Sequence, residues 1–412
     1  MNKVLQGAVL LAFVFVSCSG DFTVSVPEFE GGGAITKSLR LDDSVKAKLN
    51  GVYSVESGFD IFGRTVVGKW NGNTFSIFTG KNSAYFVLQG GRVDSSIVLE
   101  GYWRYARAVN TGLTRFMLDA QEGGREVLQG TTAPIVLRGT FGEGTSTPGS
   151  ALVLRYLRPL PQPARPFWTI AHRGGGRNSD ALPESENSLG LLQIVEHFGA
   201  NAVELDVRLT SDGVPIIFHD ENLSPRLITG EFAIGPIANY SYAHLRTLCM
   251  LKNGEPIPKL TEALETVVTK TGLSLVWMDT KVPEAIPAMI ALQREYSQRA
   301  ATLGRSVEFL IGLPTEEAMA AFLAHPLHPS ARALCEFDVA DVRRTNATVW
   351  GPSWARGPMT EDVITMHNEG RRVFFWTLDE ADYIRVFLNE GVLDGIVTDY
   401  PSIVAYEYYV RQ

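Results

Sequence analysis

The sequence predicts a multidomain protein in which an N-terminal all-β barrel or sandwich precedes an α/β domain of the (β/α)8, or TIM-barrel, class. Its 412 residues are more than one ordinary domain holds. From about residue 38 the chain carries short alternating runs between Gly and Asn turns, whereas from about residue 167 apolar strands alternate with helical stretches. Four prolines within 159–166 separate the two patterns.

The first 18 residues predict an export signal. Lys3 supplies a basic start, an apolar run over 9–16 follows, and Ser17-Cys18 closes the segment. The run is too short to span a bilayer as a stable helix. The arrangement resembles a bacterial lipoprotein signal, with Phe15 in place of the usual leucine. We therefore expect an exported protein of the bacterial cell envelope, in the periplasm or at the outer membrane, with a lipid anchor on Cys18; an ordinary secretory signal is the alternative.

The region that follows has the composition of a tether and then of an all-β domain. Residues 19–37, which include three consecutive glycines, predict a flexible tether. The all-β domain is expected over 38–158, and no catalytic group is expected from it, because it contains no histidine and no acids clustered at ligand spacing. Residues 159–166 predict a linker, since proline forces extended backbone and cannot continue a strand ladder.

The barrel domain is expected over 167–412. Nine apolar stretches are candidate strands, one more than a (β/α)8 barrel needs: 167–171, 202–208, 214–219, 273–280, 308–312, 333–337, 348–351, 373–378 and 395–398. Helices are expected at 188–197, 260–271, 283–301, 315–325, 360–369 and 381–390. Either 202–208 and 214–219 follow each other without a helix, or one of 333–337 and 348–351 is not a strand.

The ends of the first strands carry residues suited to chemistry, and barrel enzymes place their catalytic groups at these ends. His172 can exchange protons near neutral pH, and Arg173 can bind a phosphate bidentately. Glu204 and Asp206, at i and i+2 of a strand, share a face. Two adjacent carboxylates need a proton or a cation between them, and hard divalent ions prefer oxygen ligands.

Three more residues follow at strand ends. His219 closes the stretch at 214–219 and forms a candidate acid–base pair with His172. Asp279 and Lys281 lie two residues apart, so the acid could complete a metal site and the lysine could meet a phosphate oxygen. Taken singly, each residue also has a structural interpretation, as a satisfied core histidine or a member of a simple salt bridge.

Composition argues against several other classes of protein. A formal net charge of −8 gives no basic footprint for nucleic acid or for anionic lipid. Beyond Cys18 the cysteines are Cys249 and Cys335, which are far apart and predict small buried hydrophobes without a disulfide framework. The sequence has no internal repeat of the kind expected in a structural or adhesion protein.

The motifs, in this order, resemble those of the glycerophosphodiester phosphodiesterase family. They are His172-Arg173-Gly174, Glu186-Asn187-Ser188, Glu204-Leu205-Asp206, Thr210 to Gly213, His219-Asp220, Phe375-Trp376-Thr377 and the segment from Gly391 to Pro401. The resemblance covers about residues 167 to 405. It implies a (β/α)8 barrel that hydrolyses a small glycerophosphodiester to glycerol 3-phosphate and an alcohol, with the help of a metal.

The resemblance also implies a role for each site residue. One divalent cation, Mg²⁺ or Ca²⁺, would be held by Glu204, Asp206 and Asp279. The acid–base pair would be His172 and His219. The phosphate would be bound by Arg173 and Lys281, and Trp376 would form an apolar wall of the glycerol pocket.

The chain departs from the family pattern at two places. Asp279 stands where the family usually has Glu, and the segment between His172 and Glu186 is longer than usual. Asp followed two residues later by Lys is also found in sphingomyelinase D-like phospholipases, so an enzyme acting on lysophospholipid or phospholipid diesters is the alternative. A phosphoinositide phospholipase C-like barrel would also use two histidines, without needing the carboxylate cluster.

Overall fold

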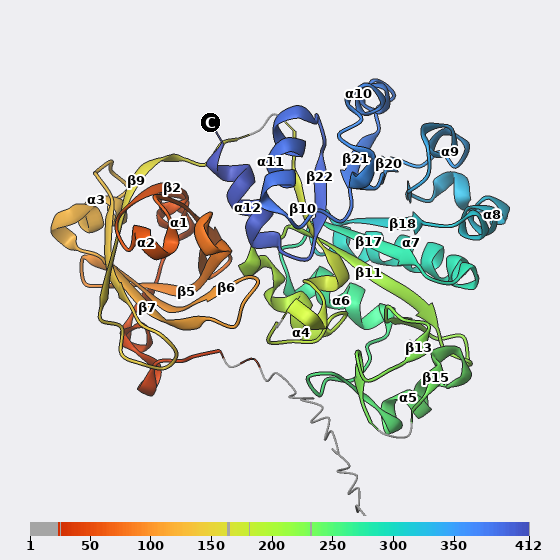
Figure 1. Cartoon of the computed structure of the whole chain (residues 1–412), viewed down its shortest axis with the longest axis horizontal. Coiled ribbons are helices and arrows are strands. Elements are labelled where there is room, and N and C mark those ends of the chain that lie inside the picture. The colour runs from red at the N-terminus through yellow and green to blue at the C-terminus, as the bar shows by residue number, and fades with distance from the viewer. Residues whose placement is uncertain (1–23, 25, 163–164, 181, 231–232, 412) are drawn as a thin grey trace, which may run out of the picture.

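The computed structural model describes residues 24, 26–162, 165–180, 182–230 and 233–411. The predictions for the export signal and for Cys18 lie outside these residues. Two barrels stand side by side, an antiparallel one built from the N-terminal part and a parallel one built from the C-terminal part (Figure 1). Among the described residues, no helix combines the length and apolarity needed to cross a membrane.

The N-terminal domain is an eight-stranded up-and-down barrel. Each strand pairs antiparallel with the next along the chain, and the last pairs with the first, which closes the sheet. Closure leaves no free sheet edge except where the short strand β1 (Leu39–Arg40) adds to β5. The strands are β2 (Gly51–Ser57), β3 (Thr65–Asn71), β4 (Thr74–Thr79), β5 (Ala84–Val93), β6 (Ser96–Tyr105), β7 (Thr111–Leu118), β8 (Val136–Phe141) and β9 (Ser150–Pro159).

Aromatic side chains fill the interior of this barrel. Phe62, on the short helix α2 (Phe59–Phe62), lies with its ring centroid 4.9 Å from that of Phe86 and 5.0 Å from that of Phe141. Trp103 packs edge-on against Phe62 at 5.5 Å. The alternating runs of the sequence are therefore strands whose inward residues form a packed core. Two more short helices, α1 (Asp43–Leu49) and α3 (Arg125–Leu128), complete the domain.

Part of the predicted tether is attached to the barrel. Glu30–Gly32 and Ala34–Lys37 form 3₁₀ turns. The Ile35 backbone N–H donates to Glu100 Oε2 at 2.7 Å, and the Arg115 guanidinium lies 4.9 Å from the Phe29 ring centroid. Residues 30–37 thus differ from a freely extended tether, because a polar contact and a ring contact fix them to strands β6 and β7.

The C-terminal domain is a closed parallel barrel of eight strands, each followed by a helix. The strands are β10 (Trp168–Ala171), β11 (Ala202–Leu209), β17 (Leu275–Thr280), β18 (Glu308–Leu313), β19 (Ala333–Cys335), β20 (Val349–Trp350), β21 (Arg372–Phe375) and β22 (Gly395–Thr398). Pairing of β10 with both β22 and β11 closes the ring. The (β/α)8 prediction is therefore confirmed for this part of the chain.

The ninth candidate strand has a simple explanation. β12 (Pro215–Ile217) follows β11 without a helix and pairs with it antiparallel, outside the ring. Thus 333–337 and 348–351 both contain true barrel strands, β19 and β20. The first of the two explanations offered by the sequence is the correct one.

Helices surround the strands, and two of them were not predicted: α9 and α12. The eight are α4 (Leu189–Ile194), α6 (Leu260–Lys270), α7 (Ile286–Thr302), α8 (Glu316–Ala324), α9 (Val339–Arg344), α10 (Thr360–Asn368), α11 (Ala381–Glu390) and α12 (Pro401–Val410). α6 shows why such segments fold as helices: Leu260, Leu264 and Val267 recur at helical spacing and are buried. α12 is buried on most sides and is therefore apolar on nearly all of them. The sequence of α12 consequently lacks the alternation of apolar and polar residues that reveals a helix.

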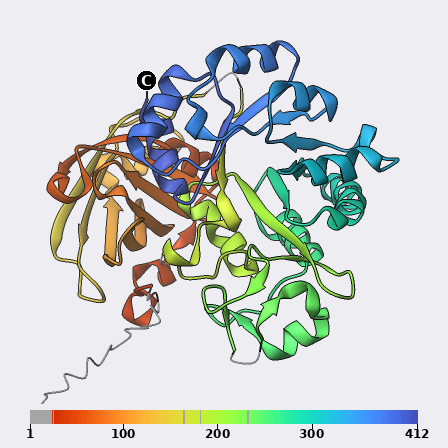
Figure 2. The ribbon, with the colours of Figure 1, turned by 45° about the vertical axis from the view of Figure 1, so that its right-hand side comes forward.

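An insertion between β12 and α6 forms a small lobe with its own core. It contains α5 (Tyr242–Leu248) and the short strands β13 (Asn222–Leu223), β14 (Ile228–Thr229), β15 (Gly235–Pro236) and β16 (Met250–Leu251). Figure 2 shows this lobe projecting from one side of the parallel barrel. Buried Phe218, Leu245 and Ile257 hold it together. Both remaining cysteines are free and buried, Cys249 in this lobe and Cys335 on β19.

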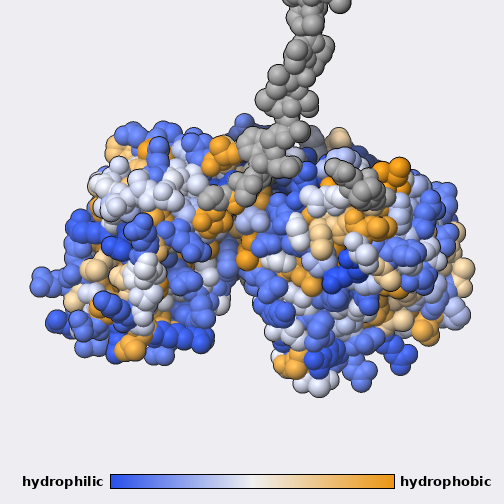
Figure 3. Space-filling model, turned by 90° about the horizontal axis from the view of Figure 1, so that it is seen from below, coloured by the Kyte–Doolittle hydropathy of each residue, from blue (hydrophilic) through white to orange (hydrophobic). Residues whose placement is uncertain are grey.

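The two barrels share a hydrophobic core. Phe78 of β4 and Tyr85 of β5 pack among residues of the parallel barrel, with the Tyr85 ring centroid 5.2 Å from that of Phe198. A Cβ at Gly199 would lie 2.6 Å from Ala405 Cβ and 3.0 Å from Phe78 Cζ, so a side chain there would separate the packed surfaces. Seen from below, the surface is hollowed between the N-terminal barrel and the C-terminal domain, with apolar residues scattered among polar ones (Figure 3). The predicted linker therefore joins domains that are packed against each other.

Candidate active site

The first strand of the parallel barrel delivers His172 and Arg173 to the carboxyl end of the barrel. The chain turns sharply there, with Arg173 at φ 51°. This left-handed conformation is uncommon for a residue with a side chain. It lets the Arg173 backbone N–H donate to Glu204 Oε2 at 2.8 Å. The turn thus fixes the strand-end residues against the neighbouring strand.

Three buried carboxylates form the centre of the site. Glu204 and Asp206 lie on β11 and Asp279 lies on β17, in register opposite Asp206. Their exposed fractions are 4%, 0% and 6%, and one oxygen from each lies within 4.8 Å of the others. The strand spacing predicted from the sequence therefore brings all three proposed metal ligands together.

The negative charge crowded into this buried cluster favours a bound cation. Burial and repulsion by Asp206 raise the pKa of Glu204 to about 8. Burial opposes ionisation of Asp206 as well, but the positive charge of Lys281 is the largest influence that holds its pKa below the usual value. Asp279 Oδ1 is buried with no hydrogen-bond donor. Three oxygen ligands with excess negative charge suit one hard divalent ion.

Lys281 contributes the positive charge already present. Its Nζ lies 2.9 Å from Asp206 Oδ1 and 2.6 Å from Asp279 Oδ2. Burial alone would lower the pKa of Lys281, but the two aspartates and Glu204 raise it above its ordinary value. Lys281 is therefore a fixed cation at the edge of the carboxylate cluster.

His172 is held by a carboxylate that directly follows the last strand of the ring, β22. Its Nδ1 lies 2.7 Å from Asp399 Oδ1, and its Nε2 lies 3.9 Å from Glu204 Oε2. Burial disfavours the charged imidazole, yet the hydrogen bond that His172 donates to Asp399 and the charges of Glu204 and Asp399 together raise the pKa of His172 above its ordinary value. The shift favours the protonated form of His172.

His219 has the opposite tendency. Its Nδ1 lies 2.7 Å from Asp220 Oδ1, and its Nε2 lies 2.9 Å from Arg173 Nη2. A guanidinium can only donate, so Nε2 accepts and the proton of the neutral ring sits on Nδ1, facing Asp220. Burial, the largest influence, lowers the pKa of His219. The two histidines that the sequence singled out thus lie on the same face with pKa values displaced in opposite directions.

Arg173 and Trp376 also lie at the carboxyl end of the barrel. Arg173 Nη1 donates to Glu186 Oε1 at 3.0 Å, which aims the guanidinium toward His219. Trp376 follows β21 and is half-buried, and its Nε1–H donates to the Gly351 carbonyl at 2.7 Å. The structure therefore gathers all the predicted site residues at one end of the barrel.

Four supporting residues received no role from the sequence. Asp399 orients His172, and Glu186 orients Arg173. Asn187, at φ 57°, donates from Nδ2 to Asp206 Oδ2 at 2.7 Å. All three stand within motifs that the resemblance had marked, which was the available signal. Glu336, after β19, lies beside Asp279, and burial and the charge of Asp279 raise its pKa well above the usual value; no motif pointed to it.

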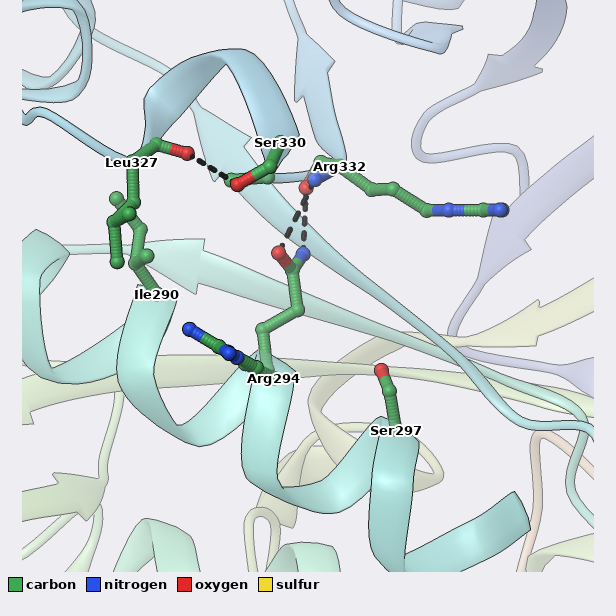
Figure 4. Close-up of a pocket in the computed structure, with 8 residues that line it drawn as sticks. Ile290, Arg294, Ser297, Leu327, Ser330 and Arg332 are labelled. Atoms are coloured by element: carbon green, nitrogen blue, oxygen red, sulfur yellow. Dashed lines mark hydrogen bonds between the residues drawn. The ribbon is translucent and has the colours of Figure 1, made fainter.

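A surface cavity lies away from the candidate active site. Residues of α7 and of the segment before β19 line a cavity of about 460 Å³ on the outside of the barrel (Figure 4). Its central amide, Gln293, donates to the carbonyls of Phe309 and Arg332 at 2.7 Å each. These groups hold a helix to the sheet, so the hollow belongs to the packing of the fold.

The fold and the site together define a (β/α)8-barrel enzyme with three buried carboxylates that could hold a cation and two histidines at the same end of the barrel. The profile of the glycerophosphoryl diester phosphodiesterase family matches residues 172–403, more than half of the chain. This chain belongs to that family. The match covers every site residue named above.

The chain is also similar to individual proteins. The chain is 30% identical over 249 residues to the probable glycerophosphodiester phosphodiesterase 2 of Mycobacterium tuberculosis, covering 56% of this chain and 86% of the relative. It is 27% identical over 242 residues to the glycerophosphodiester phosphodiesterase of Caldanaerobacter subterraneus, covering 57% and 94%. A solved phosphodiesterase of Oleispira antarctica, in complex with the product sn-glycerol-3-phosphate, aligns with a TM-score of 0.46 and 24% identity, over 60% of this chain and 95% of that one.

Proposed function

We propose that this protein hydrolyses glycerophosphodiesters to glycerol 3-phosphate and an alcohol, with one divalent ion and two histidines. The observation that carries the proposal is that His172 and His219 lie at the same end of the barrel as three buried carboxylates and have pKa values displaced in opposite directions. Family membership supports the reaction class. The remaining steps follow from which groups can bind the phosphate and which can move a proton.

Glu204, Asp206 and Asp279 would hold the ion, either Mg²⁺ or Ca²⁺. When bound, such an ion neutralises a phosphodiester oxygen and stabilises charge that develops in the transition state. Arg173 and Lys281 project toward the same region and supply fixed positive charge for the other phosphate oxygens. Both are already positioned by acids, through Glu186 for Arg173 and through the two aspartates for Lys281.

The histidines divide the proton transfers. Neutral His219 has a lone pair on Nε2 that accepts the proton of the attacking hydroxyl, once Arg173 turns toward the phosphate. Protonated His172 donates from Nε2 to the departing alcohol oxygen as the phosphorus–oxygen bond breaks. The attacker is either water or a glycerol hydroxyl that first closes a cyclic phosphate, which water then opens. Both routes leave the proton count balanced.

A substrate panel tests the reaction. The purified chain is incubated with glycerophosphocholine, glycerophosphoethanolamine, a lysophospholipid and sphingomyelin, each with and without EDTA. We expect glycerol 3-phosphate from the first two, in an EDTA-sensitive reaction. Turnover of the lysophospholipid or sphingomyelin in preference to the soluble diesters would contradict the proposal and favour the phospholipase alternative.

We also propose that the protein is exported and carries a lipid on Cys18. The support is the basic start, the short apolar run and the small residue before the cysteine. An anchor would keep the enzyme near diesters released from phospholipids. Mass spectrometry of the mature N-terminus tests this, with a diacylglyceryl cysteine expected and an unmodified start at another residue as the contradicting result.

A further inference from the structure

A hairpin of the N-terminal barrel reaches the carboxyl end of the parallel barrel. The hairpin joins β6 to β7, and Arg107 lies within it. Arg107 Nη1 donates to Glu380 Oε1 at 2.7 Å, and Nη2 donates to the backbone carbonyl of Asp379. The guanidinium carbon also lies 4.7 Å from the ring centroid of Tyr400. Arg107 thus contacts two segments near the end of β22. The first is the turn after β21, at Asp379, and the second follows β22, at Tyr400.

The first of these segments leads to the carboxylate that holds His172. The Asp379 side chain accepts, at Oδ1, from the Asp399 backbone N–H at 2.8 Å and from Thr398 Oγ1 at 3.0 Å. Asp399 in turn contacts His172 Nδ1 at 2.7 Å. Movement of the Asp379 turn would therefore release the backbone of the residue that orients His172.

The second segment leads to the same carboxylate by another route. The Tyr400 hydroxyl donates to Asp180 Oδ1 at 2.7 Å. Asp180 binds Arg177, whose Nε lies 3.0 Å from Asp399 Oδ2. The backbone N–H of Asp399 and its Oδ2 are therefore each held by groups that connect to the contacts of Arg107.

The hairpin itself is anchored. Ala106 is buried in the shared core, and its backbone N–H donates to the Ser83 carbonyl at 3.0 Å. The ion pair with Glu380 is of little consequence, because Glu380 is 62% exposed and surface ion pairs contribute little. The contacts that matter are those to the Asp379 carbonyl and the Tyr400 ring, since they link one fixed element to another.

We propose that Arg107 is a positioning residue for His172, and that the N-terminal barrel is in this way a structural part of the active site. The inference rests on the proposed role of His172 as proton donor. It assigns no chemistry to Arg107, which acts by fixing the turn at Asp379 and the ring of Tyr400. The expected signature is a slower chemical step with unchanged substrate binding, because Arg173 and Lys281 are held by other elements.

The test compares Arg107→Ala with Arg107→Lys and with the control Arg138→Ala in the full chain. Arg138 lies on β8 of the same barrel and pairs at the surface with Glu122, remote from these contacts. We expect Arg107→Ala to lower kcat roughly tenfold to a hundredfold, as a small misplacement of a catalytic group does. KM should stay within about twofold of the parent value. Arg107→Lys should recover part of kcat, and Arg138→Ala should match the parent.

A spectroscopic readout separates positioning from a general loss of structure. The proton between His172 Nδ1 and Asp399 should give a downfield NMR resonance, assigned by its loss in Asp399→Asn. We expect this resonance to shift or broaden in Arg107→Ala, and to be unchanged in Arg138→Ala. If Arg107→Ala is too unstable to purify, Arg107→Lys carries the same two measurements.

Two outcomes would overturn the inference: unchanged kcat and unchanged resonance in Arg107→Ala, or a raised KM with kcat preserved. His172→Ala serves as the reference for the proposed function. Near-normal activity of His172→Ala would refute the acid–base role itself. A large loss in His172→Ala beside normal activity in Arg107→Ala would refute only the role of Arg107.

Discussion

The two site histidines differ in their partners and in the balance between burial and charge that shifts their pKa values. His172 faces Asp399 and Glu204, whereas His219 accepts a hydrogen bond from Arg173. Replacing either histidine by alanine should lower kcat by roughly 10²–10⁴-fold, the usual effect of losing a positioned proton-transfer group. The variants should keep the parent melting temperature, since both rings lie at strand ends. Near-normal turnover in one variant would identify that histidine as structural.

The same assignment predicts the pH dependence. Activity needs neutral His219, whose pKa is lowered, and protonated His172, whose pKa is raised, so kcat/KM should be flat across neutral pH and fall on both sides. Asp399→Asn removes a carboxylate that raises the pKa of His172. The alkaline limb should therefore move to lower pH while the acidic limb stays in place. A shift of the acidic limb instead would contradict the assignment.

The carboxylate cluster predicts a graded response of metal affinity to substitution. Glu204→Gln or Asp279→Asn removes a ligand charge and should weaken Mg²⁺ or Ca²⁺ binding by at least about tenfold, measured by calorimetry. Asp279→Glu should retain binding, because it restores the usual family residue. Glu336→Gln should weaken binding less, since Glu336 lies beside Asp279 but outside the three-acid cluster. Equal affinities in all four variants would place the ion elsewhere.

At the scale of elements, the sequence predicted the strands better than the helices. Each of the eight ring strands overlaps a predicted stretch, and β11, β18 and β21 extend one residue beyond it. The strands were recognisable because buried parallel strands appear in the sequence as apolar runs. The extra strand β12 was ambiguous, since its apolar run resembles that of a ring strand and only pairing reveals its antiparallel place. α12 was missed because Pro401 at its start and apolar residues on all sides conceal the helical period.

The site residues also differed in how well the sequence predicted them. Residues that would touch substrate or metal stand at strand ends with recognisable spacing, and the sequence identified them. The residues that hold these groups come from the ends of other strands: Asp399, just after β22, holds His172, just after β10, and Glu336, just after β19, lies beside Asp279 on β17. Such contacts depend on closure of the barrel, so local patterns could not predict them.

At the scale of the whole molecule, the shared core changes one expectation. The sequence predicted no catalytic group in the all-β domain, so the parallel barrel alone would be expected to carry the activity. However, Phe78 and Tyr85 cover residues of the parallel barrel, and Arg158 Nη2 donates to the carbonyl oxygens of Val410 and Arg411. Removal of the N-terminal barrel would expose this apolar face.

Phe78→Ala tests how far stability depends on this interface. Phe78 is fully buried between the barrels, so truncation should lower the free energy of unfolding by about 3–5 kcal/mol. The exposed Phe59, at the start of α2, provides a control: Phe59→Ala should cost much less. Denaturant unfolding measures both. Equal, small effects would mean that the two barrels are coupled only by the chain.

The most direct test of the central claim is a ³¹P NMR time course of the purified chain with glycerophosphocholine, first after chelation and then after adding Mg²⁺ or Ca²⁺. Our account predicts no turnover in the chelated sample and, once the ion is added, a resonance of glycerol 3-phosphate with release of one choline per phosphate. A brief cyclic phosphate resonance would be compatible, because either attacking group leads to the same product. Full activity after chelation, or release of phosphocholine in place of glycerol 3-phosphate, would contradict it.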